Sequence, residues 1–239
     1  VIGMNFESSL DSKKIINETT GKIELTGEHS IGMYASGNGN YEIQNLGEIS
    51  MLSSSSLRTP NIGIYTNNKN SLIKNKGIIS VGAKSIGIYG HSVNTENDSD
   101  ISVGNSGIGV YSSKGNLDLA GDLKIGNKEA KGVYLVGNSA QNVAYKFSKF
   151  TLGDDSFGLV NKGKNKTITS TTNKVDLNNR NMFMYSEDNL GSITNHTALR
   201  SNGDQNYGIY SSGTVTNYGN IDFSQGVGNV GTYSYSEGA

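Results

Sequence analysis

The chain has 239 residues, of which 34% are hydrophobic, and a formal net charge of −1. Gly, Asn and Ser together supply 93 residues, and the hydrophobic share lies below the about 45–50% usual for a globular domain, so we expect no thick compact core. With only three arginines and almost no net charge, the sequence offers no basic surface to neutralise a phosphate backbone, which argues against nucleic acid as a partner.

The residue types also argue against intrinsic disorder. Disordered chains favour proline and high net charge and contain few β-branched and aromatic residues. This chain has one proline, 13 tyrosines and many isoleucines and valines. It therefore carries the residue types of β-strands without the hydrophobic content of a thick core.

The sequence contains no obvious membrane or targeting segment. No stretch approaches the about 18–20 apolar residues of a transmembrane helix, so we expect no membrane insertion. The chain starts Val-Ile-Gly, without an initiator methionine or a signal peptide, and we expect it to be a segment of a longer protein. The absence of cysteine mildly favours an exported protein, although many cytosolic proteins also lack cysteine.

A four-residue motif recurs along the whole chain: a variable residue, a glycine, an aliphatic residue and usually a tyrosine. Clear copies begin at Ile31, Ile62, Ile86, Ile108, Lys131 and Tyr207, and weaker copies begin at Ile2, Phe157, Met182 and Val230. In one copy the glycine position is taken by Phe183. Successive copies lie 22 to 31 residues apart. This spacing is typical of a solenoid repeat.

Two further short strands fit between successive copies of the motif. Eight to ten residues before most motif glycines, apolar and polar residues alternate, as in residues 79–82 and 101–104, which predicts a strand with one buried face. Shortly before these strands an asparagine recurs, at Asn45, Asn75, Asn97, Asn195 and Asn217. A third short strand, such as residues 72–74, often precedes the asparagine. Each coil should thus hold three strands of three to five residues.

These repeats predict an all-β fold, a right-handed parallel β-helix of about nine coils of about 25 residues, forming one unit over residues 1–239. Helical repeats are excluded because each glycine costs about 1 kcal/mol in a helix relative to alanine. A propeller blade needs about 40–45 residues, and the leucine pattern of leucine-rich repeats is absent. A single coil buries too little apolar surface to fold alone, so stability should come from contacts between neighbouring coils.

This geometry predicts where the side chains of the recurring aliphatic residue and tyrosine point. The aliphatic residue after the glycine should form a ladder inside the core. The tyrosine after it should point outward or at a corner, and a row of such rings could bind a ligand or simply stack and shield the backbone. The candidate ligand-binding tyrosines are Tyr65, Tyr89, Tyr111 and Tyr134.

Glycine and asparagine are assigned structural roles. We expect the motif glycine where the backbone bends, or where no Cβ fits beside the stacked tyrosine. We expect the recurring asparagines to hydrogen-bond from coil to coil.

Two connections depart from the repeat and are places where function could be grafted onto the rod. The connection from Ile49 to Gly63 has 14 residues, and its extra segment, residues 52–61, contains four serines, the only proline and Arg58, a further candidate ligand-binding residue. A second connection carries Lys162, Lys164 and Lys166, which predict a small basic protrusion. The alternative for both is a tolerated surface insertion.

Catalytic and metal-binding patterns are weak, so we expect no enzyme, no cofactor and no metal. The three histidines (His29, His91 and His196) lack partners at metal-ligand spacing and are interpreted as surface residues. Serines 53–56 lack the glycines of a nucleophile elbow. The acidic pairs Asp98/Asp100 and Asp154/Asp155 lack an accompanying Arg or His at a matched position in the repeat.

Residues 75–82 (Asn-Lys-Gly-Ile-Ile-Ser-Val-Gly), 85–89 (Ser-Ile-Gly-Ile-Tyr) and 217–222 (Asn-Tyr-Gly-Asn-Ile-Asp) resemble the passenger repeats of large fusobacterial autotransporter adhesins. The resemblance extends over essentially the whole chain. It implies a type V secreted passenger, held at the bacterial surface by a C-terminal outer-membrane barrel that is not in this chain. It also implies a monomeric adhesin or stalk that engages a host-cell receptor or a partner bacterium. The alternative is a β-helical polysaccharide-degrading enzyme or phage tailspike, which would need acidic residues from several coils in one groove.

Overall fold

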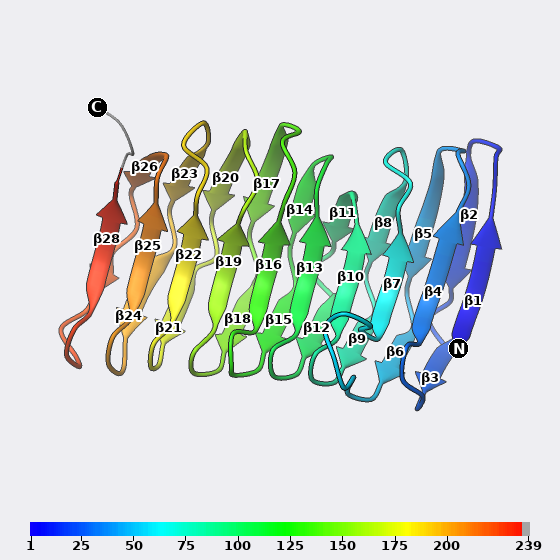
Figure 1. Cartoon of the computed structure of the whole chain (residues 1–239), viewed down its shortest axis with the longest axis horizontal. Helices are drawn as coiled ribbons and strands as arrows, with labels where there is room; N and C mark the ends of the chain where they lie inside the picture. Colours follow the sequence, from blue (N-terminus) through cyan, green and yellow to red (C-terminus); the bar gives the residue numbers. More distant parts are fainter. Residues whose placement is uncertain (236–239) are drawn as a thin grey trace.

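The computed structural model describes residues 1–235, and in this range the chain winds into a rod of stacked coils built only from β-strands and turns (Figure 1). The strands are two to six residues long and pair in parallel with the equivalent strands of the coils before and after. The repeat of about 25 residues therefore corresponds to one coil, as the motif spacing predicts.

The strands stack into long parallel sheets. Sheet A has ten strands: β1 (Ile2–Glu7), β4 (Ile31–Ser36), β7 (Ile62–Thr66), β10 (Ile86–Gly90), β13 (Ile108–Ser112), β16 (Lys131–Leu135), β19 (Phe157–Asn161), β22 (Met182–Ser186), β25 (Tyr207–Ser211) and β28 (Val230–Ser234). Sheet B has nine: β2 (Lys13–Asn17), β5 (Tyr41–Asn45), β8 (Leu72–Asn75), β11 (Ser92–Thr95), β14 (Leu117–Leu119), β17 (Gln141–Tyr145), β20 (Lys166–Ser170), β23 (Ser192–Asn195) and β26 (Thr214–Asn217).

The third side of the rod is divided between two sheets. Sheet C has six strands: β3 (Lys22–Leu25), β6 (Glu48–Met51), β9 (Ile78–Val81), β12 (Asp100–Val103), β15 (Asp122–Ile125) and β18 (Lys149–Leu152). Sheet D has three: β21 (Lys174–Leu177), β24 (Ala198–Ser201) and β27 (Ile221–Asp222). The ladder thus breaks between β18 and β21, where bulky aromatic side chains (Tyr145, Phe147, Phe150 and Phe183) fill the core.

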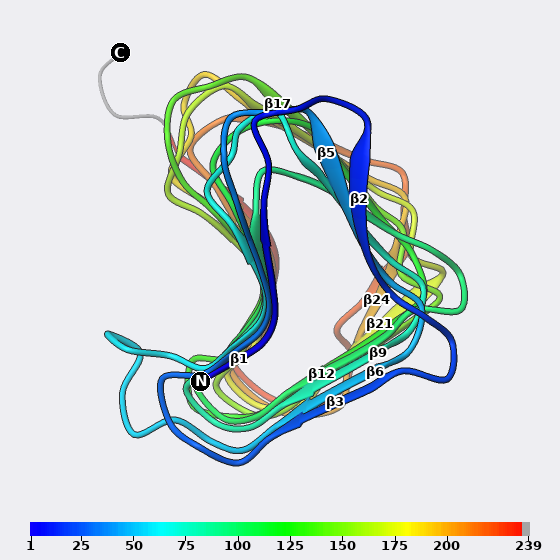
Figure 2. The same cartoon turned by 90° about the vertical axis from the view of Figure 1, so that its right-hand side faces the viewer.

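The solenoid is right-handed, as predicted. In the view from its N-terminal end (Figure 2), the chain rises along β1, descends along β2 and crosses the base along β3, a clockwise path that recedes from the viewer. The same view shows that sheet A curves inward, so its outer face is concave.

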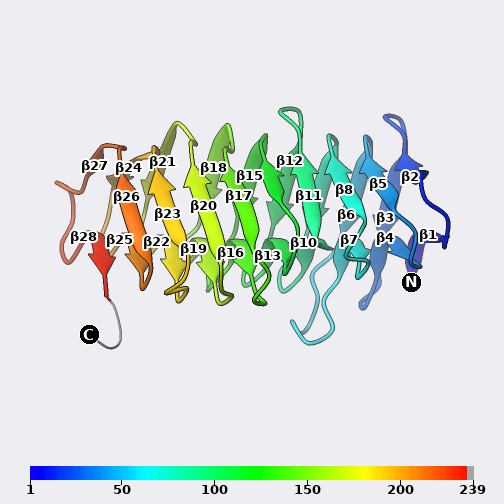
Figure 3. The same ribbon diagram turned by 90° about the horizontal axis from the view of Figure 1, so that it is seen from above.

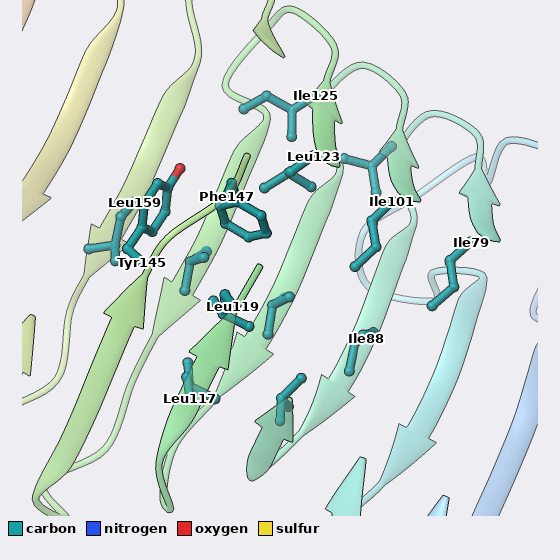
Figure 4. Packing of buried hydrophobic residues seen from close by; sticks show 14 of the residues in the cluster. Ile79, Ile88, Ile101, Leu117, Leu119, Leu123, Ile125, Tyr145, Phe147 and Leu159 are labelled. Atoms are coloured by element: carbon teal, nitrogen blue, oxygen red, sulfur yellow. The ribbon is translucent and has the colours of Figure 1, made fainter. Parts of the chain in front are cut away.

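The core is a stack of aliphatic ladders. Ile64, Ile88 and Val110 lie in register on adjacent strands of sheet A and are fully buried. They meet residues such as Ile79 and Ile101 from sheet C in the interior (Figure 4). The prediction that the aliphatic residue after each motif glycine points inward is confirmed.

The motif glycines are required by close contact between coils. A Cβ on Gly63 would lie 2.5 Å from the carbonyl oxygen of Gly87 and 2.8 Å from Cγ2 of Ile79, distances that a real Cβ does not adopt. The expectation that no Cβ is tolerated is confirmed, but the obstruction is the next coil's backbone and a core side chain rather than the tyrosine. At the exceptional Phe183 the ring is fully buried and packs edge-on against Tyr145 at 5.6 Å.

The predicted asparagine ladder exists in two separate segments. Asn17 donates to Asn45, which donates to Asn75, each at 2.8 Å, and Asn195 donates to Asn217 at 2.8 Å. The inclusion of Asn97 was wrong, because Asn97 is exposed and Asn75 instead donates to Ser99 at 2.6 Å. In the intervening coils the ladder position is occupied by other residues, namely Thr95, Leu119, Tyr145 and Ser170.

Candidate binding surface

The four candidate tyrosines lie together on the concave outer face of sheet A. Tyr65, Tyr89 and Tyr111 stack nearly parallel, with ring centroids 5.0 and 4.5 Å apart, and Tyr134 meets Tyr111 edge-on at 5.5 Å. Tyr34 extends the row by stacking on Tyr65. All five rings are half-buried. The structure therefore joins the predicted tyrosines into one continuous surface feature, in which each ring covers much of its neighbour.

A row of isoleucines beside the tyrosines was not recognised from the sequence. Ile62, Ile86 and Ile108, with Ile31 next to them, form a hydrophobic cluster with the tyrosine rings that is separate from the core. Strict alternation would place Ile62 on the same face as Ile64, yet Ile64 belongs to the core and Ile62 to the outer cluster. The available signal was the isoleucine before the glycine in four consecutive copies of the motif.

The concave face is uncharged over the four coils that contain these isoleucines. Burial of the phenol group raises the pKa of Tyr111 to about 12, and burial likewise raises the pKa of Tyr65. Both phenols thus stay neutral at physiological pH. This part of sheet A presents an apolar surface with hydroxyl groups as its hydrogen-bonding atoms.

Arg58 lies elsewhere, on the long loop of residues 52–61 that projects between β6 and β7 (Figure 3). The base of the loop is fixed because Ser54 Oγ donates to the Thr59 carbonyl at 3.0 Å and Asn61 Nδ2 donates to the Leu52 carbonyl at 2.9 Å. Arg58 is exposed, as are Leu52 and Leu57, which are 57% and 42% exposed. The loop therefore projects from a base that hydrogen bonds fix, and it exposes Arg58 and two leucines.

The predicted basic protrusion around residues 162–166 is wrong. Lys166 is fully buried, and its Nζ donates to the Ser139 carbonyl at 2.8 Å. Lys164 donates to the Glu187 carbonyl, and Lys162 pairs with the Glu187 carboxylate. Lys162, Lys164 and Lys166 therefore bind oxygen atoms of the chain itself and do not form a projecting basic surface.

The interpretation of all three histidines as surface residues is wrong for His91. His91 is 7% exposed, with Nε2 3.2 Å from the Asn67 carbonyl oxygen and Nδ1 3.1 Å from Ser113 Oγ. Burial lowers the pKa of His91, and the positive charges of Lys69 and Lys114 lower it further, whereas the hydrogen bond to the Asn67 carbonyl oxygen opposes this effect. His29 and His196 are exposed.

Acidification should therefore destabilise the solenoid through His91. Because the folded pKa lies below the unfolded value of about 6.5, the unfolded chain binds more protons, and stability falls as pH drops through about 6.5. Thermal midpoints from pH 7.5 to 5 should decline less steeply in His91→Gln than in the parent. Substitution of the exposed His29 is the control and should leave the slope unchanged; equal slopes for His91→Gln and the parent would contradict the assignment.

The acidic pairs do not form a common site. Asp155 makes a bidentate ion pair with Arg180 one coil later, so the expectation that no arginine accompanies it at a matched position was wrong. Asp154 accepts hydrogen bonds from Asn179, whereas Asp98 and Asp100 are exposed on another part of the rod. These carboxylates act as coil-to-coil connectors or lie in solvent.

The remaining surface has shallow pockets. One of about 400 Å³ lies at the break between β18 and β21, and one of about 380 Å³ lies beside β2 and β5. Within residues 1–235 there is no group of three or more His, Cys, Asp or Glu residues placed to hold a metal ion. The same residues include no helix long and apolar enough to cross a membrane.

Comparison with known proteins gives no further guide to identity. No protein-family model matches the chain, and neither a curated protein nor a solved structure matches it.

Proposed function

We propose that this chain is an adhesive segment, or the adjoining stalk, of a passenger displayed on a bacterial surface, where it binds a host-cell receptor or a surface component of a partner bacterium. The observation that carries the proposal is the outer cluster of isoleucines and tyrosines on the concave face of sheet A. Large exposed apolar patches mark interaction sites, and in this cluster the half-buried tyrosine rings are the exposed part, covering Ile62, Ile86 and Ile108, which are 6–8% exposed. The resemblance of the repeats to autotransporter passengers supports the same assignment.

The arrangement suits recognition without turnover. A rigid solenoid holds side chains at a fixed repeat along its length, so many modest contacts can add up. Tyrosine rings supply contact area at low cost in conformational entropy, with a hydroxyl at the tip for hydrogen bonding. The loop of residues 52–61 adds a second exposed feature, with Leu57 and Arg58 near its tip.

The test is to introduce charge on the concave face while keeping the fold. In the double variant Tyr89→Lys/Tyr111→Lys the long aliphatic stems can still cover the isoleucines, while the ammonium groups disfavour an apolar partner. We expect attachment of the displayed passenger to host cells or partner bacteria to fall by about tenfold or more. Changes of Tyr89 and Tyr111 to serine would be less informative here, because removing the rings also uncovers the isoleucines.

The matched control is Ser80→Lys/Ser102→Lys, which places two lysines in register on the outer face of sheet C. It should attach as well as the parent. A second variant shortens the loop of residues 52–61. If the loop variant and the variant Tyr89→Lys/Tyr111→Lys both stay folded and attach like the parent, this segment is shaft. Depolymerisation of a polysaccharide by the purified segment would instead favour the enzyme alternative.

A further inference from the structure

The tyrosine row on sheet A has one missing ring. In the register of the sheet, Tyr134 pairs with Val160, which pairs with Tyr185, and the row continues with Tyr210. Tyr185 stacks on Tyr210 at 5.3 Å, but no ring contact joins Tyr185 to Tyr134. The β19 coil therefore interrupts an aromatic row that runs on both sides of it.

Two lysines lie at this interruption, where Glu187 pairs with Lys162 and accepts a hydrogen bond from Tyr185, and Glu129 lies near Lys131. The isoleucine row gives way to Lys131, whose Nζ lies 5.8 Å from the ring centroid of Phe157. Lys162 Nζ lies 5.0 Å from the centroid of Tyr185. Phe157 and Tyr185 meet edge-on at 6.5 Å, so the two lysines and two rings form one connected cluster around Val160.

Lys131 makes no ion pair among the described residues; its Nζ donates to the Glu129 carbonyl at 2.8 Å. Burial against the aromatic face lowers the pKa of Lys131, and Lys162 lowers it further, against the opposing charge of Glu129. An ammonium group that is partly desolvated and lacks a counterion favours an anion beside it. Lys162 is different, because it pairs with Glu187.

The spacing of the coils would admit one ring at this position once the side chains that cover Val160 move aside. Neighbouring strands lie about 4.8 Å apart, so the side chains of Tyr134 and Tyr185, two coils apart, are separated by about 10 Å. A ring in contact with both needs about 7–8 Å, because carbon atoms pack about 3.5–4.0 Å apart. Val160 is 3% exposed, which means that neighbouring side chains now close over it. The flexible Lys162 covers the face of Tyr185 and would have to swing aside.

We propose that the position above Val160 binds a carboxylated sugar ring, such as a terminal sialic acid or a glucuronic acid, with its carboxylate on Lys131 and Lys162. The negative face of an aromatic ring attracts the polarised C–H bonds of a sugar ring. Lys131 supplies the unpaired cation, and Lys162 can exchange Glu187 for the ligand because an exposed ion pair contributes little to stability. The phenol of Tyr134 is available to the sugar hydroxyl groups.

The decisive variant is Val160→Tyr, which fills the missing position with the residue found in the neighbouring strands. It should fold like the parent, because the same residue stacks at this register elsewhere in sheet A. Binding of the purified chain to immobilised sialyllactose and to a glucuronic acid conjugate should fall at least about tenfold, with lactose as the neutral reference. Preference for one acid over the other identifies the source of the carboxylate.

The charge contribution is tested by Lys131→Gln, with Lys124→Gln as the matched control on the outer face of sheet C. Lys131→Gln should weaken binding of the acidic sugar by about tenfold and reduce its salt dependence, whereas Lys124→Gln should change neither. Equal affinity of the parent and folded Val160→Tyr for the acidic sugar would overturn the site. Competition by inorganic phosphate as effective as that by the sugar acid would overturn the role of the ring.

This inference rests on the proposed adhesive function only in assuming that the sugar belongs to a cell surface. The sugar site and the adhesive function can therefore fail separately. If sugar binding is lost in Val160→Tyr while cell attachment is unchanged, the site stands and its adhesive role fails. If cell attachment depends on Tyr89 and Tyr111 while no acidic sugar binds the parent, the adhesive function stands and this site fails.

Discussion

Replacement of Val110 by aspartate should lower the free energy of unfolding by about 3–5 kcal/mol, because a buried carboxylate without a partner keeps its full desolvation cost. Val110 is fully buried between Ile88 and Val133, its register neighbours in sheet A. Aliphatic side chains surround it, so a carboxylate there would have no cation to pair with. The loss is a large fraction of the about 5–15 kcal/mol by which domains are usually stable.

Urea and thermal unfolding followed by circular dichroism measure this loss. The control is Lys114→Gln, in the same coil but exposed, which should stay within about 0.5 kcal/mol of the parent. Because coils can unfold partly independently, midpoints should be compared before free energies are extracted. Coincident unfolding curves for Val110→Asp and Lys114→Gln would show that Val110 does not face the core.

Removal of half a coil should abolish folding around the deletion, whereas removal of one whole coil should leave a shorter solenoid. Deleting residues 87–108 joins Ile86 to Gly109 and restores the sequence Ile-Gly-Val-Tyr at the junction. Ile62, Ile86 and Ile108 are in register, so β7 can pair with the rejoined strand as it paired with β10. Each coil contacts mainly its neighbours, so the remaining interfaces are unaffected.

The half-coil deletion, residues 87–97, removes β10 and β11 and brings β12 to the place of a sheet A strand. Every following strand would then meet the wrong sheet, and ladders on both sides of the deletion would lose their partners. We expect the whole-coil variant to keep its β-sheet spectrum and a cooperative melt, and the half-coil variant to be trypsin-sensitive and aggregation-prone. Folded, protease-resistant protein from both deletions would contradict the coil as the unit of stability.

Much of this fold is readable from the sequence because a solenoid repeats the same local environment in every coil. The recurring glycine, aliphatic residue and tyrosine specify the inward ladder of Val110 and the outward row of Tyr89, and a spacing of about 25 residues specifies coils with three strands. Alternation within a four-residue strand is enough to choose its buried face. The shared face of the four candidate tyrosines follows from the same register.

The tertiary structure decided the features in which one coil differs from the next. Ile62 lies in the outer cluster although alternation would place it with Ile64, and the glycine between them is required by a contact that only the following coil makes. Asn97 leaves the ladder because the register places Thr95 beside Asn75. Lys166 and His91 are buried through carbonyl oxygens contributed by other coils, at Ser139 and Asn67.

The break between sheets C and D and the gap at Val160 arise in the same way. Periodicity in the sequence describes the average coil and therefore determines the fold. Contacts between particular coils, which depend on the bulk of Phe150 and Phe183 and on the register that brings Lys131 and Lys162 around Val160, appear only when the coils are stacked. The sequence by itself thus determined the solenoid and its tyrosine row. The stacking of the coils decided where that row is interrupted and that two lysines lie at the interruption.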